Sequence, residues 1–268
     1  PLPIALFGYK YAIAFIHIPT SWVWLFPVKV KSDASEKLKE VIYEIRSCPS
    51  FVKHDISRIV LRSDNAKEFF SDNVENLCKS LNIIHDATLP YVHSQAADIE
   101  RFWRTVMHSA MAMMATGRVN HKYWPWAYCQ GTNIINCMPK KQKDGKIGHS
   151  AYFRRFGELP DFSNFRVFGS TVGKFIDKSN RSKLDSTAIL GVYFGNSSPK
   201  GAKTHFSEFL VFIPESQTIP KLGQIKVLEN IDAIGYVAAH PLSLDWDIAG
   251  AGSEPANQIP VDPVSTGS

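Results

Sequence analysis

Hydrophobic and polar residues alternate at the start of the chain with the spacing of two strands and then a helix. The apolar runs at 11–16 and 22–26 are rich in β-branched and aromatic residues, and the short turn at 19–21 predicts an antiparallel hairpin. Residues 32–48 carry apolar side chains at helical spacing, with Ser35 in place to cap the helix. The chain is therefore predicted to open with a β-hairpin followed by an amphipathic helix.

The alternation of strands and helices continues toward the middle of the chain. Strands are predicted at 56–61 and 83–85, a broken helix at 65–81, and helices at 98–116 and 123–137. This order is typical of an α/β domain in which helices flank a mixed sheet.

The helix predicted at 98–116 carries Glu100 in its first turn. Trp103, Met107 and Met111 recur at helical spacing and are expected to form the buried side, which would turn Glu100 toward the sheet. The aromatic residues of the next helix, 123–137, are expected to lie in the core, because stacking on nucleic-acid bases requires exposed rings.

From residue 165 the pattern changes to short strand-like runs separated by turns, which predicts a small β-rich module. Residues 206–214 are expected to form its hairpin arm, and the Gly-, Pro-, Ser- and Ala-rich residues from 249 onward read as a linker or disordered tail. The expected runs are 165–171, 186–194, 208–214 and 224–228. The predicted organisation is a core at 1–138, a basic linker with a helix at 139–164, the β-rich module at 165–235 and a tail at 236–268.

Composition excludes several classes of protein. In a chain of 268 residues, 44% are hydrophobic, which is enough for a sizeable core, and no apolar run is long enough to predict a membrane span. The four cysteines show neither Cys-x-x-Cys nor zinc-ligand spacing, so we expect free thiols in a reducing compartment. No signal-peptide pattern is present at the start of the sequence.

The basic residues are clustered more than the net charge of +5 suggests. For any one of them a solvated surface is the ordinary explanation, but as a set they suit contacts with phosphates, which position a nucleic acid without reading its sequence. The first group is Lys140, Lys141, Lys143 and Lys146, and the second is Arg154, Arg155, Arg166, Lys174, Lys178, Arg181 and Lys183.

Asp64 and Glu100 are the candidate catalytic carboxylates. Asp64 follows a predicted strand and Glu100 opens a helix, so both side chains could converge on a divalent cation and support phosphoryl transfer. Taken singly, an Asp after a strand is usually part of a turn, and a Glu in a first helical turn usually satisfies the helix dipole. The motifs around them favour the catalytic interpretation.

These motifs resemble the integrase core of copia-type long-terminal-repeat retrotransposons, over roughly residues 1–235. The resemblance includes Gly8-Tyr9-Lys10-Tyr11, Arg62-Ser63-Asp64-Asn65, Thr88-Leu89-Pro90-Tyr91, Glu100-Arg101, Arg104-Thr105, Arg166-Val167-Phe168-Gly169, Lys183-Leu184-Asp185 and Lys200-Gly201. It implies a ribonuclease H-like mixed sheet flanked by helices, followed by an SH3-like β-rich module.

The resemblance also implies a function. Asp64 and Glu100 would be the second and third members of an Asp, Asp, Glu triad that holds Mg²⁺ or Mn²⁺. The protein would process the 3′ ends of the element's cDNA and join them to target DNA, with Lys140 and Lys141 positioning DNA and with Gln95 and Arg101 touching phosphate. We expect a homo-oligomer in the active form, no membrane association, and action in the nucleus after synthesis in the cytoplasm.

The sequence departs from the family pattern in ways that weaken the catalytic expectation. The chain begins at Pro1, after the family's first Asp and its strand, so metal binding is expected to be weak or lost and the strands beside that position would lack partners. Ala66 and Ala97 replace two family glycines, and His17 replaces a strand-ending Asp. The alternatives are therefore an inactive or domesticated relic that binds DNA or a protein partner, and a related nuclease or transposase.

Overall fold

The computed structural model describes residues 2–48, 51, 59–63, 71–87, 97–140, 145–176, 178–184, 186–199 and 206–228.

The N-terminal hairpin forms as predicted. Strands β1 (Tyr11–His17) and β2 (Trp22–Val28) pair antiparallel after a short 3-10 helix, η1 (Leu6–Gly8). The buried Thr20 closes the turn, because its hydroxyl accepts the Trp22 N–H at 3.2 Å and lies 2.8 Å from Nδ1 of His17. His17, the last residue of β1, therefore contacts the turn.

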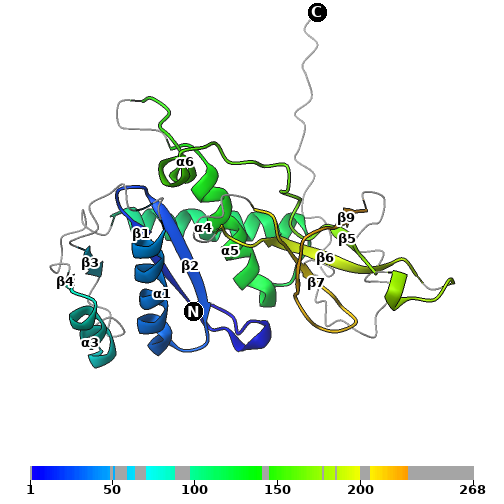
Figure 1. Cartoon of the computed structure of the whole chain (residues 1–268), viewed down its shortest axis with the longest axis horizontal. Coiled ribbons are helices and arrows are strands. Elements are labelled where there is room, and N and C mark those ends of the chain that lie inside the picture. The colour runs from blue at the N-terminus through cyan, green and yellow to red at the C-terminus, as the bar shows by residue number, and fades with distance from the viewer. Residues whose placement is uncertain are drawn as a thin grey trace, which may run out of the picture.

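The two faces of the hairpin contribute to two different cores. Ile13, Phe15, Trp22 and Trp24 face helix α1 (Ala34–Ser47), which lies on one side of the hairpin in Figure 1. The residues between them in sequence face α4 (Ala97–Thr116) and α5 (Trp124–Cys137) on the other side. Because successive side chains of a strand point to opposite faces, the one hairpin packs against helices on both of its faces.

Helix α1 has the predicted apolar side, but the predicted cap is wrong. Leu38, Val41, Ile42 and Ile45 are buried. Ser35 lies inside the first turn, and its hydroxyl only approaches the Ser32 carbonyl at 3.5 Å. A 3-10 turn, η2 (Lys31–Asp33), leads directly into the helix, and its Lys31 carbonyl accepts the N–H of Ala34.

A second, separate sheet consists of two parallel strands. β3 (Ile59–Ser63) pairs with β4 (Ile83–Ala87), and α3 (Asp72–Ser80) connects them. Within the described residues this sheet and the β1–β2 sheet share no hydrogen-bonded pair. The mixed α/β class is confirmed, with antiparallel and parallel pairs in separate ribbons. Residues 56–58 of the predicted strand and residues 65–70 of the predicted helix lie outside the described residues.

The buried side of α4 differs from the predicted one. Phe102, Val106, Ala110 and Met114 are buried, whereas Met107 is 40% exposed and Met111 is 54% exposed. Helix α4 is apolar on two adjacent stripes, so spacing alone could not decide which stripe packs against α5. Trp103 and Met107 of the predicted stripe line an open groove described below.

The C-terminal part is a five-stranded sheet with the order β8-β7-β6-β5-β9 and antiparallel pairs throughout. The predicted strand at 165–171 is wrong, because residues 165–170 form a turn whose Phe168 packs into the core. The segment at 206–214 contains one strand of an antiparallel hairpin, as expected, and its Phe209, Val211 and Phe212 are buried in mid-sheet. The strands are β5 (Thr171–Phe175), β6 (Ala188–Asn196), β7 (Phe209–Phe212), β8 (Lys221–Leu222) and β9 (Lys226–Val227), with η6 (Lys178–Asn180) between β5 and β6. The SH3 type stays a prediction.

Helix α5, which follows η5 (His121–Tyr123), joins the hairpin to the β-rich module through a buried row of amides. Asn136 donates to the Val23 carbonyl and accepts the Val23 N–H, both at 2.9 Å. Asn133 donates to the Asn196 carbonyl at 2.8 Å, and Gln130 accepts the Asn196 N–H at 2.9 Å. Because unpaired buried amides are costly, these bonds fix α5 against both β2 and β6.

Candidate nucleic-acid and metal site

Glu100 lies on the exposed first turn of α4. Asp98, two residues earlier, pairs with Arg101 at 3.5 Å on the surface, and within the described residues the Glu100 carboxylate forms no ion pair. Glu100 precedes Trp103 and Met107 on the same stripe of the helix, so its position is next to the open groove rather than in the core. An exposed carboxylate at this position is accessible to a cation or to water.

Asp64 lies outside the described residues, but the strand that leads to it is described. β3 and β4 are parallel and in register, with Ser63 opposite Ala87, so both strands end at the same edge of their sheet. Ser63 Oγ lies 2.8 Å from Nε2 of His85, and Arg62 pairs with Asp86 at 3.2 Å, which fixes that edge. The chain enters the segment of Asp64 and the segment before α4 from this one edge.

The described residues include Glu100 but not Asp64, so they test the predicted metal site only in part. Among the residues whose placement is described, no group of three or more His, Cys, Asp or Glu side chains is placed to hold a metal ion. Glu100 thus supplies a single carboxylate, which by itself does not make a site for Mg²⁺.

Three cations gather near the start of α4: Arg101 on α4 itself, Lys140 in the loop after α5, and Arg154 on the next helix. Partial desolvation lowers the pKa of Lys140; the neighbouring Asp98 opposes this shift, and Arg154 and Arg101 reinforce it. Arg154, on helix α6 (Ala151–Phe156), donates from Nη1 to Ser21 Oγ at 3.3 Å. Arg101, Lys140 and Arg154, hereafter the cation cluster, therefore concentrate positive charge beside the turn that carries Glu100, as contacts to phosphates require.

The remaining predicted nucleic-acid residues divide into two groups. Lys146 is exposed in the segment that leads to α6, where the Gly148 N–H donates to the Lys140 carbonyl at 2.9 Å. Gln95, Lys141 and Lys143 lie outside the described ranges, so their proposed phosphate contacts stay predictions.

Two arginines of the predicted second basic group hold structural positions, and the first of them is not available to phosphates. Arg155 is fully buried, pairs with Glu44, and packs over the rings of Trp22 and Phe51. Arg166 donates to the backbone carbonyls of Ser163 and Phe165. Sequence alone gave no sign of this, because a basic residue looks the same whether it is solvated or holds a structural position.

The aromatic residues near α5 are confirmed as largely core. Tyr123, Trp124 and Tyr128 are buried, while Trp126 is half-buried. The four cysteines are free, and burial raises the pKa of both Cys129 and Cys137 to about 12, which agrees with a packing role. No helix within the described ranges is long and apolar enough to cross a membrane.

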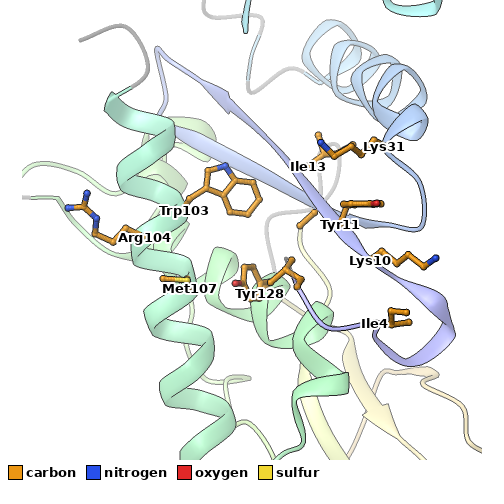
Figure 2. Close-up of a pocket in the computed structure, with 11 residues that line it drawn as sticks. Ile4, Lys10, Tyr11, Ile13, Lys31, Trp103, Arg104, Met107 and Tyr128 are labelled. Atoms are coloured by element: carbon orange, nitrogen blue, oxygen red, sulfur yellow. The ribbon is translucent and has the colours of Figure 1, made fainter. Parts of the chain in front are cut away.

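The structure also shows a feature that the sequence interpretation missed, a groove of about 670 Å³ between α4 and β1. Figure 2 shows Trp103 and Met107 of α4 on one side and Tyr11 of β1 on the other, with Tyr128 and Ile4 at the lower end. The sequence signal for the groove is the apolar pair Trp103 and Met107, whose helical spacing equally predicts a buried surface.

Comparisons with known proteins confirm the resemblance drawn from the motifs. No family model matches the chain. The chain is 25% identical over 190 residues to the retrovirus-related Pol polyprotein from transposon TNT 1-94 of Nicotiana tabacum, covering 70% of this chain and 14% of that protein. It is 23% and 25% identical to the corresponding polyproteins from transposons RE2 and RE1 of Arabidopsis thaliana, covering 74% and 73% of this chain and 13% of each relative.

The chain is thus similar to Pol polyproteins of copia-type plant transposons and spans about one seventh of their length. Among solved structures, the catalytic core domain of BIV integrase resembles it with a TM-score of 0.39 at 19% identity, covering 56% of this chain and 89% of that one.

Proposed function

We propose that this chain is the integrase region of a retrotransposon Pol polyprotein, which binds DNA and takes part in metal-dependent DNA joining. Its similarity to Pol polyproteins over most of the chain supports this assignment. The observation that carries it to a site is the exposed Glu100 beside the cation cluster of Arg101, Lys140 and Arg154. A carboxylate next to convergent cations suits a reaction at a phosphodiester.

Each group has a distinct role in this proposal. The cation cluster holds DNA phosphates next to the first turn of α4, and Lys141, Lys143, Lys146 and Gln95 extend that contact. Glu100 and Asp64 would hold Mg²⁺ or Mn²⁺, which when bound supplies activation of the attacking oxygen and stabilisation of the leaving oxygen. The substrates would be the cDNA ends of the element and target DNA, the active form a homo-oligomer, and the place of integration the nucleus.

A non-catalytic DNA-binding role is the second candidate. Ala66 and Ala97 stand where the resembled family has glycines, and both flank the proposed carboxylates. In this case the cation cluster would still bind DNA, but no divalent cation would be needed and no strands would be joined.

DNA binding tests what both candidates share. We expect fluorescence anisotropy with a labelled duplex to show affinity that falls steeply with salt, and Arg101→Ala, Lys140→Ala and Arg154→Ala each to lower the salt slope by about 1. Lys79→Ala, on the exposed end of α3, is the matched control and should leave the slope unchanged. Equal slopes for all four variants would refute the cation cluster as the DNA site.

Strand joining separates the two candidates. In a longer polypeptide in which an Asp-bearing strand precedes this chain, we expect Mg²⁺- or Mn²⁺-dependent joining of duplex ends to a plasmid. Asp64→Asn and Glu100→Gln should each abolish it. Salt-dependent DNA binding without joining in that polypeptide would favour the non-catalytic candidate, and cleavage without joining would favour a nuclease.

A further inference from the structure

Side chains on both faces of the β3–β4 sheet tie the ends of its two strands together. On one face, Ser63 Oγ lies 2.8 Å from Nε2 of His85, hereafter the inner pair. On the other face, Arg62 pairs with Asp86 at 3.2 Å, hereafter the outer pair. Both pairs lie within the last three residues of their strands, at the edge from which the chain continues to Asp64.

The inner pair is shielded from water, whereas the outer pair is not. Ser63 is 8% exposed and His85 is half-buried, but the side chains of Arg62 and Asp86 are 52% and 50% exposed. An ion pair in water contributes little to stability, while loss of a shielded hydrogen bond leaves a polar group desolvated. The inner pair is therefore the contact that holds the end of β3 in place.

The inner pair also runs diagonally across the two strands. The register places Ser63 opposite Ala87 and Leu61 opposite His85. The contact between Ser63 and His85 therefore joins the last residue of β3 to a residue further inside β4. Because strand ends fray first, a diagonal contact at the last residue opposes both fraying and a slip in register.

Asp64 follows Ser63 directly in the sequence, so the inner pair acts one residue away from a proposed metal ligand. A metal ligand must be held within about 0.5 Å of its productive position, and hydrogen bonds around the ligand provide this precision. We propose that Ser63 and His85 are positioning residues, which fix the end of β3 so that Asp64 can share the cation with Glu100. This role rests on the proposed function, because it requires Asp64 to hold a metal ion.

Mn²⁺ binding in the longer polypeptide, followed by electron paramagnetic resonance, tests the positioning role. Ser63→Ala and His85→Leu should each weaken Mn²⁺ binding about tenfold, as the loss of a hydrogen bond around a metal ligand does. The double variant should be little worse than either single variant, because both remove the same contact. Ser63→Thr keeps the hydroxyl and His85→Gln keeps a polar end group, so each should recover most of the affinity.

Asp86→Asn is the matched control, because it removes the outer pair next to His85 and should leave Mn²⁺ affinity unchanged. Hydrogen exchange in the metal-free chain gives a second readout. Ser63→Ala and His85→Leu should speed exchange of the β3 backbone amides more than Asp86→Asn does, with α1 and α5 unaffected. A variant that simply fails to fold would speed exchange in those helices as well.

Unchanged Mn²⁺ affinity in Ser63→Ala and His85→Leu, or an equal loss in Asp86→Asn, would overturn the positioning role. Asp64→Asn in the same assay separates this failure from failure of the proposed function. If Asp64→Asn weakens Mn²⁺ binding and the variants of the inner pair do not, only the positioning role is rejected. If Asp64→Asn has no effect, the proposed metal site is rejected and the positioning role with it.

Discussion

Gly117 and Gly169 pack against each other where α4 ends and the turn before β5 begins. A Cβ atom on Gly117 would lie 2.3 Å from the Phe168 carbonyl oxygen, and one on Gly169 would lie 2.7 Å from the Cα of Gly117. Gly169 also has φ of +86°, which other residues rarely adopt. The glycine of the Arg-Val-Phe-Gly motif is therefore explained by a close backbone contact.

Substitution of these glycines should destabilise the fold. We expect Gly117→Ala and Gly169→Ala each to lower the free energy of unfolding by about 1–3 kcal/mol, measured in urea, because backbone atoms must move apart. Gly223→Ala is the control, since no atom lies within 4 Å of its added Cβ and its φ is not positive. A loss as large in the control would show that the contact is not the cause.

Two desolvated thiols, those of the half-buried Cys129 and the buried Cys137, give a pH dependence whose sign follows from their pKa values. Burial raises the pKa of Cys129 and Cys137 from 9.0 to about 12, so the unfolded state loses these protons first as pH rises. The free energy of unfolding should therefore be unaffected below about pH 9 and should fall between about pH 9 and 12. Urea titrations at several pH values measure this, with the Cys129→Ala, Cys137→Ala double variant as control.

Thiol labelling gives an independent check on the same two residues. At pH 8 a disulfide reagent should label Cys129 and Cys137 much more slowly in the native protein than in urea, because the reactive thiolate is suppressed. Rapid native labelling at either position, located by mass spectrometry, would contradict the buried environment.

At the scale of elements, α6 carries two adjacent arginines with opposite roles. The guanidinium of Arg155 is fully buried, lies 4.4 Å from the Trp22 ring centroid, and pairs with Glu44. Glu44 also accepts the indole N–H of Trp24 at 2.9 Å, so the pair ties α6 to both α1 and β2. Arg154 is exposed and belongs to the cation cluster.

The two arginines predict separable effects. Arg155→Ala should cost about 3–5 kcal/mol in urea unfolding, because it removes one partner of a buried ion pair. Arg154→Ala should change stability by no more than about 0.5 kcal/mol while weakening DNA binding. If Arg154→Ala destabilised the protein as much as Arg155→Ala, its effect on DNA could not be assigned to phosphate contact.

The elements that the sequence predicted well are those with local signals. The β1–β2 hairpin and helices α1 and α5 follow from alternation or helical spacing within one window. The wrong predictions arise where contacts with residues distant in the sequence decide the structure. Helix α4 has two apolar stripes, and α5 packs against one of them. Phe165 and Phe168 give a strand-like pattern to residues that form a packed turn.

The candidate site was predictable to a similar degree. Motif spacing predicts Glu100 and Arg101 as site residues and the run of lysines predicts Lys140, and the structure brings the two cations near Arg154. The sequence could not distinguish the exposed Arg154 from the buried Arg155. Burial of Arg155 depends on Glu44 and Trp22, which lie far away in the sequence.

For the whole molecule, α5 is the element that relates the proposed site to the β-rich module. Its buried amides bond to β2 on one side and to the end of β6 on the other, as the central position of α5 in Figure 1 suggests. Since both contacts use backbone groups in well-ordered strands, the module is held against the helices that form the groove and the cation cluster. DNA held by the cluster would therefore meet a fixed arrangement of the two parts.

The central claim, that Asp64 and Glu100 share a divalent cation, is tested most directly by Mn²⁺ binding, followed by electron paramagnetic resonance in the longer polypeptide with its Asp-bearing strand. We predict that Asp64→Asn and Glu100→Gln each weaken Mn²⁺ binding at least tenfold and that the double variant is little worse than either. Glu36→Gln, in the equivalent exposed first turn of α1, should have no effect. Unchanged Mn²⁺ affinity in either single variant, or full additivity of the two, would contradict a shared site.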